Sequence, residues 1–400
     1  MTLSELNTPC YVLDVEKLES NYYALYKAFS EKWNSQIIIG YSFKTNSLPW
    51  VLTWMKEHGA YAEVVSADEF ELAKRLGFPI NRVIFNGPVK GKSSILETLN
   101  AGGIVNLDSF SEIELLEKNR PTEGKWKIGL RFNFDLEKEC PGETIMGDEP
   151  GRFGFNVENN SFEAAVKKIT DLGYIDIVGL HAHHSTKTKS LKIFNVLAKK
   201  IVELSELINH ELDYVDIGGC LFGDKPGAPT FDEYASTVIN VISNGCFTKN
   251  AKIIIEPGAS IIASPFSYMC SIMDVKTVKC KNILTTNGSL IHIDPQMHGI
   301  RFQKRVERLS QNSKKSIIRE QILTGFTCIE KDRLGTFEDE CELCIGDRII
   351  FSNTGAYSMT LSPLFISYYP YVYVKQGDDY KCVRNKWTVE NFIQNNEVYR

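Results

Sequence analysis

A repeated alternation of short apolar runs and helix-like segments is the feature that most constrains the fold of this chain. Eight β-type runs follow one another, at residues 37–43, 60–66, 82–88, 104–109, 127–133, 174–183, 213–219 and 252–258. The first five start 22 or 23 residues apart, which is room for one strand, one helix and two short loops. Between them lie stretches with helical spacing, such as 67–78, which ends near Gly77. The runs are apolar on both faces, as is typical of parallel strands covered by helices.

Eight such units in series predict a (β/α)8 barrel, a TIM barrel, over about residues 30–265. A doubly wound open sheet is the alternative, but such sheets rarely reach eight regular units. After residue 265 the pattern changes, and short β runs dominate, at 267–280, 289–294, 321–330, 347–353 and 365–374. We therefore expect an N-terminal segment, 1–29, that joins the β domain through its strand 10–14, then the barrel, 30–265, and an all-β domain, 266–400.

Composition excludes several classes of function. Hydrophobic residues make up 43% and charged residues 24% of the chain, and the formal net charge is −5, without a long basic block. A nucleic-acid partner is therefore not expected. The sequence shows neither a signal-peptide pattern nor an apolar run of membrane-spanning length, so we expect a cytoplasmic protein. Ten scattered cysteines are expected to be reduced, and the lone pair Cys341 and Cys344 is interpreted as two strand residues, not as a metal or redox site.

Titratable side chains gather where the eight runs end. In a barrel of this kind the chemistry lies at the carboxyl ends of the strands, because the loops there surround one mouth. The residues at these ends are Lys44, Glu63, Ser66, Asn86, Asp108, Arg131, His181, His183, Asp216, Gly218, Gly219 and Glu256. Any one of them can be polar only because a strand end meets water, but the whole set indicates an active site. The Pro/Gly-rich segment 135–155 is an insertion of the kind that covers a substrate.

The chemistry of this set is that required by an aldehyde cofactor. A lysine amine in a barrel mouth can form a Schiff base with an aldehyde. Gly218 and Gly219 leave backbone N–H groups accessible to a phosphate, Glu256 suits a pyridine nitrogen, and His183 can lie flat against a ring. These are the needs of pyridoxal 5′-phosphate, which stabilises a carbanion at the Cα atom of an amino acid. A Schiff-base aldolase, which needs a barrel lysine but no cofactor, is the alternative from the pattern alone.

Motifs along nearly the whole chain resemble the fold-type III pyridoxal-phosphate decarboxylases, the group of ornithine, arginine and diaminopimelate decarboxylases related to alanine racemase. In the barrel region the matching segments are, in order, "YSFKTN" (41–46), "EVVSADE" (63–69), "LRFN" (130–133), "GRFGF" (151–155), "GLHAHHST" (179–186), "DIGGC" (216–220) and "EPG" (256–258). In the β region, "CIEKDRL" (328–334) resembles the decarboxylase Cys-x-x-x-Asp signature, and "GAYS" (355–358) resembles Gly-Ala-Tyr.

The resemblance implies a decarboxylase that uses pyridoxal 5′-phosphate and works as a homodimer with shared active sites. The implied catalytic residues are Lys44 and His183 with Cys328 and Asp332, the last two delivered from the partner subunit. Cys328 would return a proton to the Cα atom. The implied cofactor-binding residues are Lys44, Glu63, Arg131, His183, Thr186, Gly218, Gly219, Glu256, Gly258 and Tyr357.

Three positions depart from the family pattern. Cys220 stands at the third glycine of the phosphate loop, and Ala259 replaces an arginine. Ile329 follows Cys328, where the family commonly has an acid that holds the distal amino group of the substrate; Glu330 is adjacent, but on a strand it would point the other way. Since isoleucine cannot pair with an ammonium group, we expect a distal end that is N-acylated, citrylated, acidic or carrier-bound, as in siderophore or other specialised biosynthesis.

Three alternatives stay open. One is a diaminopimelate- or ornithine-type decarboxylase that acts on a free distal amine. Another is an amino-acid racemase of the same fold, whose catalytic residue in the β domain would be a tyrosine. The third is a non-catalytic homologue, and the presence of both Lys44 and Cys328 argues against it.

Overall fold

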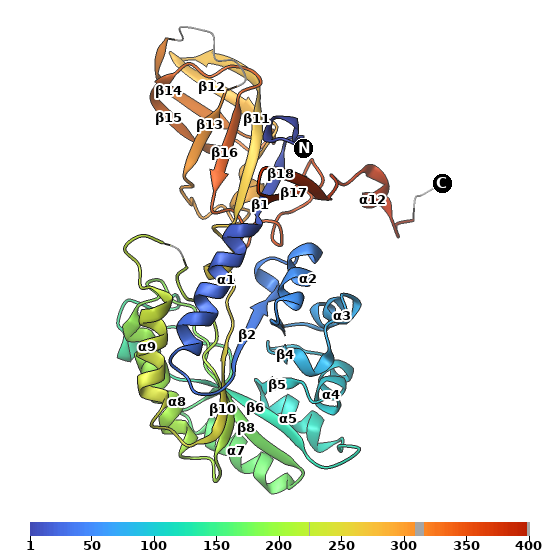
Figure 1. Ribbon diagram of the computed structural model, residues 1–400, viewed down its shortest axis with the longest axis vertical. Coiled ribbons are helices and arrows are strands. Elements are labelled where there is room, and N and C mark those ends of the chain that lie inside the picture. The colour runs from blue at the N-terminus through green and yellow to red at the C-terminus, as the bar shows by residue number, and fades with distance from the viewer. Residues whose placement is uncertain (224, 309–315, 398–400) are drawn as a thin grey trace. The chain divides into compact units, whose positions relative to one another are not determined.

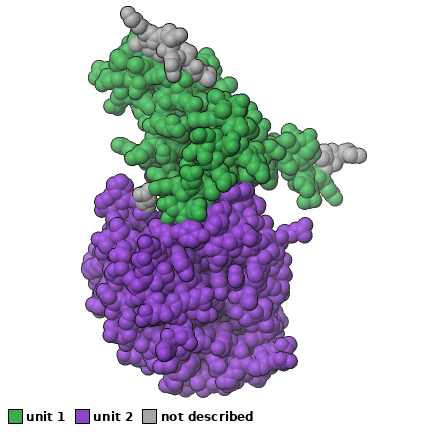
Figure 2. Space-filling view, in the orientation of Figure 1, with its two compact units in different colours: residues 1–20, 261–400 green, residues 21–260 purple. Residues whose placement is uncertain are grey.

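The computed structural model describes residues 1–223, 225–308 and 316–397. The chain divides into two compact units, one formed by residues 21–260 and the other by residues 1–20 together with 261–400 (Figure 2). Among the described residues, none of the helices has the length and apolar character that crossing a bilayer requires.

The unit of residues 21–260 contains a closed barrel of parallel strands (Figure 1). Its strands are β2 (Ile37–Ser42), β3 (Tyr61–Val64), β4 (Val83–Phe85), β5 (Ile104–Leu107), β6 (Trp126–Asn133), β8 (Ile175–His181), β9 (Leu212–Asp216) and β10 (Phe247–Ile255). The ring is closed because β10 pairs with β2 and β5 pairs with β6. Each of the eight runs expected from the sequence overlaps one of these strands. The (β/α)8 barrel is therefore confirmed, and the open sheet is excluded by the closing pairs.

Helices alternate with the strands, as the spacing predicts. They are α1 (Val15–Ser30), α2 (Pro49–Glu57), α3 (Ala67–Arg75), α4 (Lys92–Asn100), α5 (Phe110–Glu117), α7 (Ser161–Leu172), α8 (Leu191–Ser205), α9 (Phe231–Ile242) and the short α10 (Ala259–Ile262). Side-chain caps start several of them: the hydroxyl groups of Ser66, Ser190 and Thr230 accept backbone N–H groups of the first turns of α3, α8 and α9. These caps fix where each loop at the barrel mouth ends.

The insertion after β6 has little regular structure. It contains α6 (Leu136–Glu139) and β7 (Phe155–Asn156), which pairs with the end of β6. An isolated bridge between Thr144 and Thr186 links it to the loop after β8. The carboxylate of Glu143 adds to this link by accepting hydrogen bonds from the hydroxyl groups of Thr188 and Ser190. The insertion is thus held at the carboxyl ends of the strands.

Two glycines make room for a tyrosine inside the barrel. A Cβ atom on Gly179 would lie 2.1 Å from the Cζ atom of Tyr214, and one on Gly129 would lie 2.1 Å from the hydroxyl oxygen of Tyr214. The ring packs in an apolar cluster with Ile38, Ile84, Val178 and Ile254. Its hydroxyl donates to Oδ1 of Asn106 at 2.7 Å. Tyr214 therefore joins the apolar part of the barrel interior to a polar part.

The second unit is built on a nine-stranded sheet. Its strands are β1 (Cys10–Asp14), β11 (Phe266–Val278), β12 (Lys281–Thr286), β13 (Lys304–Glu307), β14 (Ile317–Thr324), β15 (Arg333–Cys341), β16 (Arg348–Ser352), β17 (Tyr371–Gln376) and β18 (Asp379–Arg384). The N-terminal strand β1 lies between β11 and β17, antiparallel to the first and parallel to the second. Two short helices, α11 (Leu290–Ile293) and α12 (Val389–Ile393), complete the unit.

The structure corrects several strand predictions in this unit. Residues 290–293 form a helix, residues 325–332 form turns after β14 has ended at Thr324, and residues 365–370 lie before β17. Short apolar runs do not distinguish a strand from a buried helical turn, and here the carboxylate of Asp332 accepts the N–H of Leu290 at the start of the helix. Of the two cysteines in the CxxC pair, only Cys341 is in a strand.

We expect Gly179→Ala to lower the free energy of unfolding by about 3 kcal/mol, because its methyl group overlaps the Tyr214 ring and overpacked cores lose this much. Gly59→Ala is the control: it has open space around its Cβ position but a left-handed backbone, which costs alanine about 1 kcal/mol. Urea denaturation measures both. Equal losses in the two variants would contradict the proposed packing.

Candidate active site

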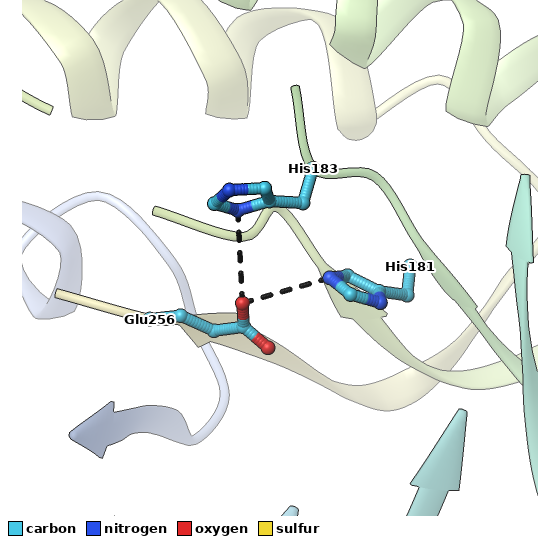
Figure 3. Close-up of side chains that lie close together, drawn as sticks. All are labelled: His181, His183 and Glu256. Atoms are coloured by element: carbon cyan, nitrogen blue, oxygen red, sulfur yellow. Dashed lines mark ion pairs between the residues drawn. The ribbon is translucent and has the colours of Figure 1, made fainter. Parts of the chain in front are cut away.

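Two histidines and a glutamate converge at the carboxyl ends of β8 and β10, the two strands on either side of β9 (Figure 3). The Nε2 atom of His181 lies 3.6 Å, and the Nδ1 atom of His183 lies 3.8 Å, from Oε2 of Glu256. His181 is the last residue of β8, and Glu256 directly follows β10. Glu256 is only 4% exposed, and a carboxylate so deeply buried needs charged or hydrogen-bonding partners. Burial alone would raise the pKa of Glu256, but the electrostatic interaction with His181 lowers it below its usual value, which favours the ionised carboxylate.

Lys44 is held at the barrel mouth by a second buried carboxylate. It lies in a short 3-10 turn, Phe43–Thr45, directly after β2. Its Nζ atom is 3.0 Å from Oε2 of Glu63, which also accepts the hydroxyl of Ser42 at 2.6 Å. The Lys44 side chain is 38% exposed, whereas that of Glu63 is 1% exposed. The amine is therefore fixed in position and still accessible to a small molecule, which distinguishes it from a solvated strand cap.

Arg131 lies beside the histidines. Its Nη2 atom donates to the backbone oxygen of His183 at 3.2 Å, and its Nη1 atom is 3.5 Å from Oδ1 of Asp108. The Nε atom is buried and has no hydrogen-bond partner among the described residues. The backbone N–H of Gly154, in the insertion, also donates to Asp108. Among the described residues, the Nε donor of Arg131 thus stays without a partner, and Asp108 ties Arg131 to the insertion.

A buried ion pair that the sequence analysis missed supports Asp108. The Nζ atom of Lys90 lies 2.7 and 2.9 Å from the two carboxylate oxygens of Glu112, and the Lys90 side chain is fully buried. Lys90 also donates to the backbone oxygen of Gly87, and Glu112 accepts the backbone N–H of Asp108 at 2.8 Å. A single lysine in a loop and a glutamate in a helix carry no signal of burial, so only the structure could pair them.

The glycines predicted to approach the cofactor have no room for side chains. A Cβ atom on Gly219 would lie 2.2 Å from the backbone oxygen of Glu256, and one on Gly258 would lie 2.2 Å from Oγ1 of Thr45. Gly218 has a φ of +64°, and the N–H of Gly219 donates to Nδ1 of His183. These backbones therefore pack directly against the strand ends.

The next two predicted positions lie beside this loop. Cys220 adopts a left-handed backbone, with φ of +68°, where the family has glycine. Its sulfur is 3.8 Å from the hydroxyl of Thr186, which is 5% exposed. The loop conformation is thus kept without the third glycine, although a residue with a Cβ atom is strained there by about 1–2 kcal/mol.

The remaining predicted residues belong to the other unit. Cys328 is exposed, whereas Asp332 is 2% exposed. The Asp332 carboxylate accepts hydrogen bonds from the hydroxyl groups of Ser289 and Thr327 and from backbone N–H groups of Thr327 and Leu290. With these donors Asp332 anchors the turn that carries Cys328.

The turn around Cys328 corrects the argument made against Glu330. Ile329 and Glu330 do not lie on a strand, because the N–H of Asp332 bonds to the backbone oxygen of Ile329 and closes a turn. Alternation of side chains along a strand therefore does not apply to Glu330, which is exposed, whereas Ile329 is half-buried. Tyr357, which has a left-handed backbone, is 44% exposed.

Comparison with known proteins decides the family. The model of the pyridoxal-binding domain of pyridoxal-dependent decarboxylases matches residues 16–263. This chain belongs to that family. Diaminopimelate decarboxylase of Methanocaldococcus jannaschii is 25% identical over 373 residues, which cover 90% of this chain and 84% of the relative. L-glutamyl-[BtrI acyl-carrier protein] decarboxylase of Niallia circulans is 24% identical over 408 residues, which cover 96% and 93%.

Solved structures agree on the fold. The diaminopimelate decarboxylase of M. jannaschii has a TM-score of 0.86 at 22% identity, and the match covers 99% of this chain and 93% of that chain. The arginine decarboxylase of Paramecium bursaria Chlorella virus has a TM-score of 0.76 at 18% identity, and covers 93% and 96%. The fold-type III architecture, the decarboxylase activity and the cofactor pyridoxal 5′-phosphate expected from the motifs are thereby confirmed.

The residues at the barrel mouth fit this cofactor. Lys44 offers an accessible amine for its aldehyde, and Glu256 offers an ionised carboxylate for its ring nitrogen. Gly219 has no room for a Cβ atom, and its N–H donates to Nδ1 of His183, so this loop would border a phosphate with backbone atoms alone. His183, Glu256 and His181 are also of the types that ligate metal ions, but the domain family to which this chain belongs binds pyridoxal.

We expect Lys90→Met to lower the free energy of unfolding by about 3–5 kcal/mol, because it leaves the Glu112 charge buried without a partner. The double variant Lys90→Met/Glu112→Leu should regain most of this loss, since both charges are then absent. Lys74→Met, which breaks a partly exposed pair with Glu97, should cost less than about 1 kcal/mol. Thermal and chemical unfolding measure these values. A single variant as stable as the double variant would contradict a buried ionic pair.

Proposed function

We propose that this pyridoxal-dependent decarboxylase removes the α-carboxylate of an amino-acid derivative whose distal end is not a free amine. The observation that carries the proposal is Ile329. It follows Cys328 on the turn anchored by Asp332, and it is half-buried and aliphatic. A distal ammonium group placed against it would lose water without gaining a partner. An N-acyl or N-citryl group, or an acyl linkage to a carrier, presents no such charge.

The similarity to an L-glutamyl-[acyl-carrier protein] decarboxylase supports substrates of this kind. A glutamyl group linked to a carrier has an acyl bond at its distal end in place of an amine. The relatives named as diaminopimelate decarboxylases do not separate the two classes, because all are 28% identical or less.

The roles of the barrel residues follow from their positions. Pyridoxal 5′-phosphate, when bound, supplies an electron sink for the electron pair left at Cα as CO2 departs. Lys44 would hold the aldehyde and release it to the substrate amine, while Glu63 keeps the amine in place. Glu256 would keep the ring nitrogen protonated, and His183 would cover one face of the ring. Gly218 and Gly219 would let the phosphate approach the backbone of this loop because they carry no side chains; in the structure the N–H of Gly218 donates to Asp216 and that of Gly219 donates to His183.

We also propose that Cys328 acts across a homodimer. It is exposed on the turn whose base is the buried Asp332, so that a partner subunit can receive it. In the active site of the partner subunit, the Cys328 thiol would donate a proton to Cα after CO2 leaves, and Asp332 would position the turn that carries it. Tyr357 would reach the cofactor phosphate from the same unit.

A second candidate substrate class is an amino acid with a free distal amine, of the ornithine or diaminopimelate type. The observation that favours it is the turn itself, which leaves Glu330 exposed one residue after Ile329. If Glu330 holds the distal ammonium group, its carboxylate replaces the acid that the family commonly has at the position of Ile329.

Substrate preference separates the two classes. We expect kcat/KM for ornithine, lysine, arginine and meso-diaminopimelate to lie at least about 100-fold below that for N-acylated or carrier-linked analogues, because an unpaired buried charge costs about 3 kcal/mol. CO2 release and mass spectrometry of the products measure this. Ile329→Glu should raise turnover of these four amino acids with a free distal end.

Efficient use of an amino acid with a free distal amine by the wild-type enzyme would refute the first class, the substrates whose distal end is blocked. Loss of that activity in Glu330→Gln would then establish the second. Formation of the opposite enantiomer without CO2 release would refute both and indicate a racemase.

Mixed dimers test the shared site. Lys44→Ala and Cys328→Ala should each be inactive, but coexpression should restore about a quarter of wild-type activity, because half of the dimers are hybrid and each hybrid has one intact site. Coexpression of Lys44→Ala with the double variant Lys44→Ala/Cys328→Ala is the control and should stay inactive. Hybrid dimers without activity would show that both residues act within one chain.

A further inference from the structure

A line of buried amide side chains runs through the barrel toward Glu256. The Nδ2 atom of Asn86 donates to Glu256 and, at 3.1 Å, to Oε1 of Glu63. Its Oδ1 atom accepts from Nδ2 of Asn106 at 2.9 Å, and Oδ1 of Asn106 accepts the hydroxyl of Tyr214 at 2.7 Å. All the donors therefore point the same way, from the tyrosine to the two carboxylates. The reaction roles given above leave this line unexplained.

A third buried carboxylate, that of Asp216, is hydrogen-bonded to Asn106 of this line. Its Oδ2 atom accepts from Nδ2 of Asn106 at 3.2 Å, and its Oδ1 atom accepts the N–H of Gly218 at 3.0 Å. Asp216 is 0% exposed. Glu63 has Lys44 as its cation, and Glu256 lies 3.6 Å from Nε2 of His181, but among the described residues Asp216 has no lysine, arginine or histidine nitrogen within 4.0 Å.

Three negative charges at this depth would repel one another with few cations to offset them. A buried carboxylate without a cationic partner takes up a proton instead of remaining charged. The charged and polar groups that face Asp216 are Glu63 of β3, Asn106 of β5, Arg131 of β6, His181 of β8 and Glu256 after β10, together with Tyr214 of its own strand β9. Of the three carboxylates, Asp216 is the one placed to carry the proton.

We propose that Asp216 is a positioning residue that carries a proton and donates it in a hydrogen bond to Glu256, which thereby stays the ionised member of the pair. The directions of the two pKa shifts agree with this assignment. Burial, and then the charge of Glu256 and the hydrogen bond with it, raise the pKa of Asp216 well above its usual range. The pKa of Glu256 is lowered by His181 against the effect of burial.

The consequence for the reaction lies at the ring nitrogen. An ionised Glu256 keeps that nitrogen protonated, which an electron sink at this position requires. Asn86 donates to Glu256, and the Asp216 hydroxyl of the proposal would do the same, so the charge of Glu256 would be held by oriented dipoles as well as by His181. Asp216 therefore acts through Glu256 and does not touch the cofactor.

The infrared spectrum tests the proton directly. Cofactor-free and cofactor-loaded wild-type protein should both show the carbonyl stretching band of a neutral buried carboxylic acid at neutral pH. The band should be lost in Asp216→Asn and kept in Asp213→Asn, an exposed aspartate of the same strand. A wild-type spectrum without the band, or a band that persists in Asp216→Asn, would overturn the proposal.

The pH dependence of stability gives a second readout. Because the pKa of Asp216 is raised in the folded state, the folded protein keeps a proton that the unfolded chain releases above about pH 4. The stability of the wild type should therefore fall, relative to that of Asp216→Asn, as pH rises from about 4 to 8. Asp213→Asn should not show this growing difference. A constant difference between Asp216→Asn and the wild type would contradict a raised pKa.

Catalysis separates positioning from mere packing. The amide group that Asp216→Asn introduces can still donate to Glu256, so kcat should fall by less than about tenfold, whereas Asp216→Val should lose about 100-fold. The visible absorption band of the cofactor-loaded protein should keep its pH dependence in Asp216→Asn. If Asp216→Val does not fold, the infrared and stability results on Asp216→Asn decide alone. All of these measurements are independent of which substrate class is used.

Discussion

A negative charge buried at the carboxyl end of β10 is the constraint on which the rest of this site depends. Glu256 is almost inaccessible to water, and in the role proposed for it the side chain must nevertheless stay ionised to hold a protonated pyridine ring. Three parts of the barrel surround the Glu256 carboxylate. Histidines approach from β8, Asn86 donates from β4, and Gly219 brings its backbone close because it has no side chain. Each contact exists only because the closed ring of strands places these ends beside one another.

The fold was largely predictable because its signal is repeated. One β/α unit carries weak evidence, but eight units with a regular interval leave few architectures, and the strand ends then indicate Lys44, His183 and Glu256 without further information. The β domain was less predictable since its elements are short and irregular. An apolar stretch such as 290–293 has the composition of a strand, and a distant aspartate determines that it becomes a helix.

The parts of the site that could not be predicted are those made by pairs distant in sequence. Lys90 and Glu112 appear as two ordinary surface charges until the fold buries them together. Asn106 and Tyr214 lie inside strands with no feature to distinguish them from packing residues, and the glycines that accommodate Tyr214 are equally inconspicuous. Glu330 was misplaced for a related reason: alternation along a strand was assumed where hydrogen bonds to Asp332 produce a turn.

The amide of Asn86, which bridges Glu63 and Glu256, has a consequence for how such an enzyme responds to acid and base. Its two bonds connect Glu63, the carboxylate that binds Lys44, with Glu256, the carboxylate proposed to hold the ring nitrogen. Protonation at one end therefore changes the energy of protonation at the other. A pH–rate profile will therefore report macroscopic pKa values that belong to the hydrogen-bonded group as a whole. A midpoint assigned to one carboxylate will shift when another residue of the group is replaced.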